Sequence, residues 1–414
     1  MSATNVFETK FSNRMQVTRY SSPVFSSQAS FEERSNLSDG QSVVRPTFGR
    51  LYADTYTRGS DMTEQYYSQA TETLTVNTTP ALLLPIDDFD KLQQKTDLQA
   101  RLASDGMRAL NKHVDADYLA EVANATSTVD AGDVGGSAGS PIALDATNVL
   151  RIFPAVARKL RLLNVDITGL TDQRPEKGNM KPMGSGAFAD LNPYMIEQLN
   201  YSLAGRETVG GDQLGMNGYA NTYFGFDNYA TTNGYWTGTL GIATQPTDGD
   251  TVTINDVVFT FKTVLGTTAG NVLIGANAAA SNTNLAALIN APGTTTAQGV
   301  ALSTANQRLL SRMTATAAST STAIVAKGYG YVVVSETLTA AADTWTATSQ
   351  ISHQMFGQKG AVDMVVQDAI SVSVSDIPKQ FGKYIKPRCL YGIKTYTEGK
   401  DALVDVKIQS SSWV

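Results

Sequence analysis

Apolar residues recur at helical spacing in one long stretch of the chain. Between residues 87 and 123 they form one face of an amphipathic helix of about 37 residues, or about 55 Å. Asp87 or Asp88 supplies the N-terminal cap, and Gly106 interrupts the apolar face. The face consists of Leu98, Leu102, Leu110, Val114, Tyr118 and Val122. The pattern predicts a single long helix that serves as a structural strut.

Alternating apolar and polar residues predict strands on both sides of this helix. Residues 46–85 contain two alternating runs rich in Tyr and Thr, and a polar tip at Gly59–Glu64 separates them. This arrangement predicts a long β-hairpin, which is marginally stable unless it packs against something else. Roughly the last 55 residues return to long alternating strands.

Two shorter helices and one compositional change lie between these strands. Residues 145–166 predict a helix that Pro154 kinks or breaks, and residues 191–205 predict another, with Asn192 as its cap. From Gly238 to about Gln350 the chain is rich in Thr and Ala and poor in charge. This stretch predicts an inserted α+β unit of about 110 residues.

Within the inserted unit, two strand pairs are expected. One is a hairpin that turns at Asn255–Asp256, a sequence favourable for a two-residue turn. The other covers residues 323–339 and turns at Gly328–Gly330.

The first 45 residues are polar and Ser-rich, and they cannot form a core of their own. An arm of this kind gains order when its isolated aromatic side chains dock on a neighbouring subunit, although composition alone equally allows an unstructured terminus. We expect contacts between subunits from aromatic residues of this arm and of the hairpin, namely Phe7, Phe11, Tyr20, Phe25, Phe31, Tyr52, Tyr56, Tyr66 and Tyr67.

Composition excludes several classes of protein. The chain has 414 residues, of which 42% are hydrophobic and 17% charged, as in a globular protein of two or three domains. Its net charge of -6 argues against a dedicated nucleic-acid binder. The single cysteine, Cys389, rules out an intrachain disulfide and a zinc ribbon. The sequence shows no membrane span and no signal peptide, so we expect a cytoplasmic protein.

Candidate catalytic and metal-binding residues are few. Gly135–Gly139 matches the G-x-S-x-G pattern, but no buried strand precedes it, so Ser137 is expected in a flexible linker. His113 and His353 lie in different segments, and Asp248 and Asp250 fit a turn before a hairpin better than a calcium loop. The sequence therefore predicts no catalytic residue, no cofactor and no metal site.

The order of these elements resembles the HK97-type major capsid protein of tailed double-stranded DNA bacteriophages. "PALLLPIDDFDKLQQKTDLQARLASDGMRALNKHVDADYL" is similar to the family's extended loop running into its spine helix. "LNPYMIEQL" followed by "GMNGYANTYFGFDNYATTN" resembles its helix-then-strand passage, and "YGIKTYTEGKDALVDVKIQ" resembles its last peripheral strands. Each motif is weak alone, and their order carries the resemblance.

This resemblance implies an α+β, HK97-like capsid fold with an inserted α+β domain. The implied parts are an N-terminal arm (1–45), an extended β-hairpin loop (46–86), a spine helix and following loop of the peripheral domain (87–145), an axial domain (146–237), the inserted domain (238–350), and an axial return with peripheral strands (351–414).

The implied function is self-assembly as pentamers and hexamers into an icosahedral virion shell that encloses double-stranded DNA non-specifically. The implied partners are a scaffolding protein, a portal and a cement or decoration protein, with assembly in the host bacterial cytoplasm and no membrane. The inserted domain is expected on the outer surface.

One departure from the family concerns covalent crosslinks. Some members join a loop lysine to an asparagine, but no lysine occurs here between Lys10 and Lys91, so noncovalent contacts are expected. Two alternatives stay open, namely an encapsulin-like nanocompartment shell and a β-rich adhesin or carbohydrate-binding protein.

Overall fold

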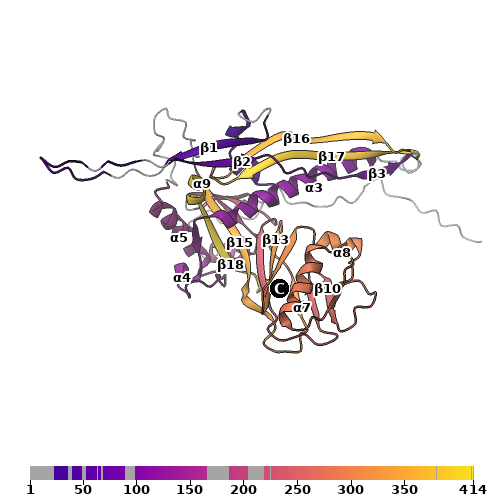
Figure 1. Ribbon diagram of the computed structural model, residues 1–414. Helices are drawn as coiled ribbons and strands as arrows, with labels where there is room; N and C mark the ends of the chain where they lie inside the picture. The colour runs from indigo at the N-terminus through magenta and orange to yellow at the C-terminus, as the bar shows by residue number, and fades with distance from the viewer. Residues whose placement is uncertain are drawn as a thin grey trace, which may run out of the picture.

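The computed structural model describes residues 23–35, 40–48, 53–62, 64–66, 69–88, 98–165, 186–203, 219–223, 225–378, 380–411 and 413. Figure 1 shows an elongated layer of long strands that lie along helix α3 (Leu98–Ala120), with more compact regions beneath it. The described strands form four sheets.

The elongated layer contains a three-stranded sheet of order β16-β17-β3, and α3 packs against it. Gly106 allows this close approach, because a Cβ atom there would lie 2.7 Å from Cγ of Pro387 in the sheet. The residue that interrupts the apolar face of the helix is thus required by the packing. The strands of this sheet are β3 (Leu84–Asp87), β16 (Asp363–Asp376) and β17 (Gly382–Lys394).

The apolar face of α3 points inward along the second half of the helix. Its last members, Leu110, Val114, Tyr118 and Val122, are each at most 3% exposed. Leu102 is half-buried. Val122 lies in η2 (Glu121–Asn124), a 3₁₀ turn that follows the helix. The side chain of Leu98 and residues 89–97 of the predicted helix lie outside the described residues.

A nine-stranded sheet forms the centre of the compact part. Its order is β12-β13-β8-β15-β5-β7-β6, and β18 pairs with both β15 and β4. Phe153, Phe226 and Phe356 pack edge to face in the main core, with ring centroids 5.7–6.0 Å apart. The strands are β4 (Ser127–Val129), β5 (Ala187–Leu191), β6 (Tyr219–Tyr223), β7 (Phe226–Ala230), β8 (Tyr235–Gly241), β12 (Met313–Ala317), β13 (Ser321–Lys327), β15 (Trp345–Gln358) and β18 (Leu403–Gln409).

Three helices accompany this sheet: α4 (Ala131–Val134), α5 (Val149–Leu162) and α6 (Pro193–Leu203). Helix α5 runs through Pro154, so a break at that residue is excluded. The apolar residues on either side of Pro154, including Phe153 and Val156, are fully buried in the core. This burial stabilises the helix across the position where proline removes a backbone donor.

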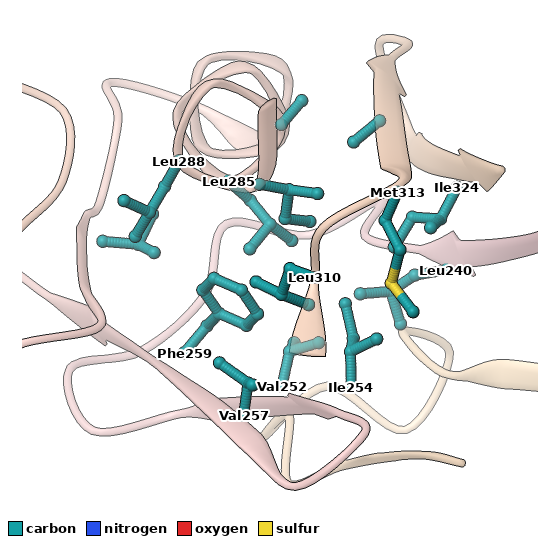
Figure 2. Packing of buried hydrophobic residues seen from close by; sticks show 14 of the residues in the cluster. Leu240, Val252, Ile254, Val257, Phe259, Leu285, Leu288, Leu310, Met313 and Ile324 are labelled. Atoms are coloured by element: carbon teal, nitrogen blue, oxygen red, sulfur yellow. The ribbon is translucent and has the colours of Figure 1, made fainter. Parts of the chain in front are cut away.

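The inserted segment has its own sheet of order β11-β10-β9-β14 and its own core (Figure 2). Asn255 and Asp256 have φ values of 47° and 65°, as a tight hairpin turn requires, and β9 pairs antiparallel with β10. The predicted hairpin is confirmed. The elements are β9 (Thr251–Ile254), β10 (Val257–Lys262), β11 (Asn271–Leu273), β14 (Val334–Glu336), α7 (Ala278–Asn290) and α8 (Thr304–Leu309).

The second predicted strand pair of this segment is wrong. Strand β13 pairs with β12 and β8, whereas β14 pairs with β9 in the other sheet. Alternation marks a stretch as a strand but does not choose its partner. Strands β12 and β13 therefore extend the nine-stranded sheet, and the expected limits at residues 238 and 350 fall inside β8 and β15.

The predicted loop hairpin is confirmed in part. Strands β1 (Ser42–Phe48) and β2 (Gln69–Thr75) pair from Ser42↔Thr75 to Phe48↔Gln69, but β1 begins before residue 46, and the described residues 53–58 ahead of the tip form no strand. The hairpin lies beside the elongated layer in Figure 1. Short helical turns complete the described chain, namely α1 (Phe25–Gln28), η1 (Glu32–Ser35) and α9 (Thr397–Asp401).

Candidate subunit interface

The tip of the loop exposes large apolar side chains to solvent. Tyr56 is 59% exposed, Met62 71% and Tyr66 85%. The tip backbone nevertheless has a defined conformation, since Ser60 N donates to Thr57 O and Gly59 has a φ of 92°. None of the described residues covers these large apolar groups, which project from a narrow loop. Exposed apolar groups of this kind mark an interaction site.

The far end of the elongated layer exposes a second apolar group. Phe381, in the turn between β16 and β17, is 76% exposed, and Leu83 beside β3 is 58% exposed. Sequence reasoning did not select Met62 or Phe381. The available signal was a large apolar residue inside an otherwise polar turn, in "GSDMTE" and "PKQFGK".

The arm aromatics that the structure describes pack within the subunit. Phe25 and Phe31 are half-buried against residues of α3 and the long strands, including Val114 and Tyr391. Their partly exposed surfaces face away from this packing, and contacts of these two residues with a neighbouring subunit stay a prediction. The remaining expected contact residues, Phe7, Phe11, Tyr20, Tyr52 and Tyr67, lie outside the described residues.

A buried carboxylate ties the arm to the rest of the fold. Asp115 Oδ1 accepts from the backbone N–H groups of Val24 and Phe25 at 2.7 and 3.2 Å, and its Oδ2 accepts from Asn233 Nδ2 at 2.7 Å. Burial raises the pKa of the Asp115 carboxyl, while these hydrogen bonds act to lower it. Asp115 lies on the buried face of α3, beside Tyr118, where an acidic residue is unexpected. An acidic residue on the apolar face of the helix is the sequence signal that could have identified this contact between the arm and α3.

One arrangement resembles a catalytic triad. His353 Nδ1 lies 2.9 Å from an oxygen of Asp405, and His353 Nε2 lies 2.8 Å from Thr237 Oγ1. These residues come from three adjacent strands, β15, β18 and β8. However, Thr237 lies mid-strand and is paired with both Val325 and Ile351, so its backbone belongs to the sheet ladder and not to a nucleophile turn. The trio links three strands across one sheet.

The other predicted candidates have structural partners. Ser137 follows α4 in a turn where Asp130 accepts from Gly132 N and Gly139 N, so this loop is hydrogen-bonded where a flexible linker was expected. His113 accepts a hydrogen bond from Arg312, which also donates to Asp117.

The remaining candidate side chains for catalysis or metal binding also have structural roles. Asp248 accepts from Thr263 N, and Asp250 accepts from Thr247 N. Burial raises the pKa of the Cys389 thiol to about 11, which keeps it protonated and unreactive. Among the described residues, no group of three or more acidic, His or Cys side chains could hold a metal ion. No helix in the described part of the chain is long and apolar enough to cross a membrane.

Comparisons with known proteins bear on the fold. No protein-family model matches this sequence, and no curated protein matches it either. Solved structures do match over nearly the whole chain. A chain of Mycobacterium phage Che8 is 13% identical with a TM-score of 0.53, covering 97% of this chain and 98% of that one. A chain of the cyanophage Pam1 capsid asymmetric unit is 12% identical with a TM-score of 0.50, covering 100% and 99%. The chain therefore has the HK97-like capsid fold that the sequence resemblance implied.

Proposed function

We propose that this chain is the major capsid protein of a tailed double-stranded DNA bacteriophage. It assembles as pentamers and hexamers into an icosahedral shell. The observation that carries this proposal is the loop tip, where Tyr56, Met62 and Tyr66 are each more than half exposed on a subunit with a capsid fold. In an assembled shell, a neighbouring copy of the same chain would bury these side chains.

The charge of the chain supports a container for DNA more than a DNA-binding protein. A net charge of -6 gives weak overall attraction to phosphates, so DNA is enclosed without tight or sequence-specific binding. We expect no enzymatic activity. We further propose a location in the virion capsid after assembly in the bacterial cytoplasm, and partners that include a scaffolding protein, a portal and a cement or decoration protein.

The parts of the subunit have proposed roles of their own. Residues 46–86 form the loop that lies over a neighbour, and the layer around α3 carries the contacts between capsomers. The inserted segment lies on the outer surface of the shell. Exposed apolar residues of this segment, such as Val264 at 80% exposure, are available there for contacts with a decoration protein or a neighbouring capsomer.

Electron microscopy of the purified protein tests the proposal, first expressed alone and then with its scaffolding partner. Uniform hollow shells are the expected result. Monomers under both conditions would contradict it. Virions isolated from an infected host should contain this chain as the main shell protein around DNA. Shells that instead hold an enzyme cargo would identify an encapsulin-like compartment.

Shell cohesion provides a second test. Because no lysine occurs between Lys10 and Lys91, the extended loop has no lysine with which to form an isopeptide bond to a neighbouring asparagine. Purified mature shells should therefore run as single chains of 44.2 kDa in hot denaturing detergent. A ladder of covalent multimers under these conditions would show that another lysine forms crosslinks.

A further inference from the structure

A pocket of about 290 Å³ lies where the spine helix meets the inserted segment. Its walls come from α3, from the end of α8 and the turn after it, and from the end of β13 with the turn that follows. These elements approach closely, because a Cβ atom on Gly328 would lie 2.8 Å from Cβ of Ala116. The volume is at the lower end of the range for ligand sites, about 300–1,000 Å³, and suits a small ligand.

The pocket is strongly basic, in contrast to the chain as a whole. Its lining includes Lys112, Arg308, Arg312 and Lys327, together with His113. None of the described residues that line it is acidic. Lys112, Arg308 and Lys327 are exposed and form no ion pair with a described residue. Arg312 forms an ion pair with Asp117, so the three other cationic side chains around this small space give a positive local potential in a chain of net charge -6.

Arg312 is fixed in position at the back of this pocket. One of its terminal nitrogens donates to Asp117 Oδ1, and Asp117 Oδ2 accepts from the hydroxyl of Tyr391 at 2.6 Å. Its other terminal nitrogen donates to His113 Nδ1. Burial lowers the pKa of His113, and the positive charge of Arg312 lowers it further, which fits a neutral ring that accepts this bond.

Two features of Arg312 are unusual for a residue in a folded core. Its Nε is buried and has no acceptor among the described residues. Its backbone has a φ of 149°, a conformation that is strained for a residue with a side chain. The strained backbone is held by a hydrogen bond from Lys327 N to Arg312 O at 3.0 Å. This backbone bond places Arg312 and Lys327, two of the four cationic residues of the pocket, next to each other.

We propose that this pocket binds a phosphate group, held by Arg312 and by the exposed Lys112, Arg308 and Lys327. The guanidinium group matches the tetrahedral oxygens of phosphate with paired donors, and lysines add point charges. A multiply charged anion balances the three cations that have no described ion-pair partner better than a single carboxylate does. The phosphate comes either from solution or from the backbone of double-stranded DNA. This inference is independent of shell assembly, since the pocket belongs to one subunit.

Equilibrium dialysis of the full-length protein against labelled inorganic phosphate tests the site, and a short DNA duplex serves as the second probe. The variant R308Q/K327Q removes two exposed charges that make no ion pair in the described structure, so its melting temperature should match that of the wild type. The matched control is K383Q, which changes an exposed lysine of β17 away from the pocket. We expect the double variant to weaken phosphate binding at least tenfold and K383Q to leave it unchanged.

The two probes separate the two sources. Saturable binding of inorganic phosphate that the duplex does not displace assigns the pocket to free phosphate. Duplex binding that phosphate displaces, and that the double variant loses, assigns it to DNA. The proposal is overturned if neither probe binds, or if the double variant binds both as the wild type does. Loss of shell assembly in the double variant without phosphate binding would instead indicate an acidic side chain of a neighbouring subunit.

Discussion

The inserted segment and the extended loop use apolar residues in opposite ways. In the inserted segment, Val252, Ile254, Phe259 and Phe261 are completely buried within the subunit. In the loop, β1 and β2 form a regular hairpin, yet among their described side chains only Leu74 is fully buried. Both regions contain strands with alternating apolar residues, so the strand pattern alone does not distinguish a buried sheet from an exposed one.

The difference lies in what covers each region. Helix α7 covers the sheet of the inserted segment, and Figure 2 shows Phe259 pointing toward Leu285 and Leu288 of that helix. Among the described residues of the loop, those near its base pack against the long strands, whereas Tyr66 at its tip is 85% exposed. A closed core stabilises a subunit, whereas an open apolar tip gains stability only in an assembly. Substitutions should therefore separate folding in the first region from assembly in the second.

The largest effect on folding is expected for Phe259→Ala. Truncation of a fully buried phenylalanine removes apolar contacts and leaves a cavity, which costs about 3–5 kcal/mol. Trp236 and Trp345 lie in the same core with ring centroids 6.3 Å apart, so tryptophan fluorescence during urea denaturation reports on it. The matched control is Val258→Ala, the adjacent residue, which is 46% exposed and should change stability by less than about 0.5 kcal/mol. Equal effects at both positions would show that this core is not closed.

Gly238→Ala should have a smaller effect, of about 1–3 kcal/mol, through overpacking. A Cβ atom at residue 238 would lie 2.0 Å from the ring of Trp236, which covers the glycine on the same face of β8. Gly241→Ala, on the same strand, is the control, because its Cβ would meet its nearest atom at 3.5 Å. Thermal unfolding of the two variants compares them directly. A normal melting temperature for Gly238→Ala would mean that the Trp236 ring moves without cost.

Sequence patterns predicted which segments form helices and strands better than they predicted which strands pair. The hairpin at Asn255–Asp256 was predictable because its turn residues adopt positive φ locally. The pairing of β13 with β8 was not, since those strands are separated by more than 70 residues and β14 follows β13 more closely along the chain. Local chemistry determines turns, whereas sheet order depends on contacts that a single sequence does not display.

The candidate interface was predictable to a similar degree. The exposed aromatics of the loop followed from its Tyr-rich alternation. The position of Phe25 and Phe31 could not be predicted in this way. Asp115 holds the arm on α3 through hydrogen bonds between residues 90 or more positions apart, which a sequence pattern does not reveal. The basic pocket was equally hidden, since its cations come from three distant segments.

The arm lies between these two cases, because it is partly covered by its own subunit. The pH dependence of folding stability tests whether the arm closes over the buried core. Gln28 donates to Asp190 Oδ1 at 2.7 Å. Burial raises the pKa of the Asp190 carboxyl well above its usual value of 3.8. The hydrogen bond from Gln28 lowers this pKa, and the nearby Asp115 raises it. A carboxyl with a raised folded-state pKa holds a proton that the unfolded chain has lost. Stability should therefore fall as pH rises from the unfolded-state pKa toward the folded-state pKa.

Asp190→Asn keeps an oxygen acceptor for Gln28 and cannot ionise. The free energy of unfolding of this variant, relative to wild type, should rise between pH 4 and pH 8 in urea titrations. If the free energy of unfolding depends on pH in the same way for both proteins, the arm does not exclude water from Asp190. This part of the arm would then resemble the exposed loop and not the closed core of the inserted segment.

The smallest effect on folding, and the largest on assembly, is expected for Met62→Ala combined with Tyr66→Ala. Both side chains are at least 71% exposed, so their removal should change the stability of the free subunit by less than about 0.5 kcal/mol. Shell formation should fall at least tenfold, measured by sedimentation and electron microscopy. Thr55→Ala, an exposed polar position in the same loop, should assemble normally. Normal shells from the double variant would mean that the tip is not the contact between subunits, and the apolar end of the elongated layer at Phe381 would then be the next surface to change.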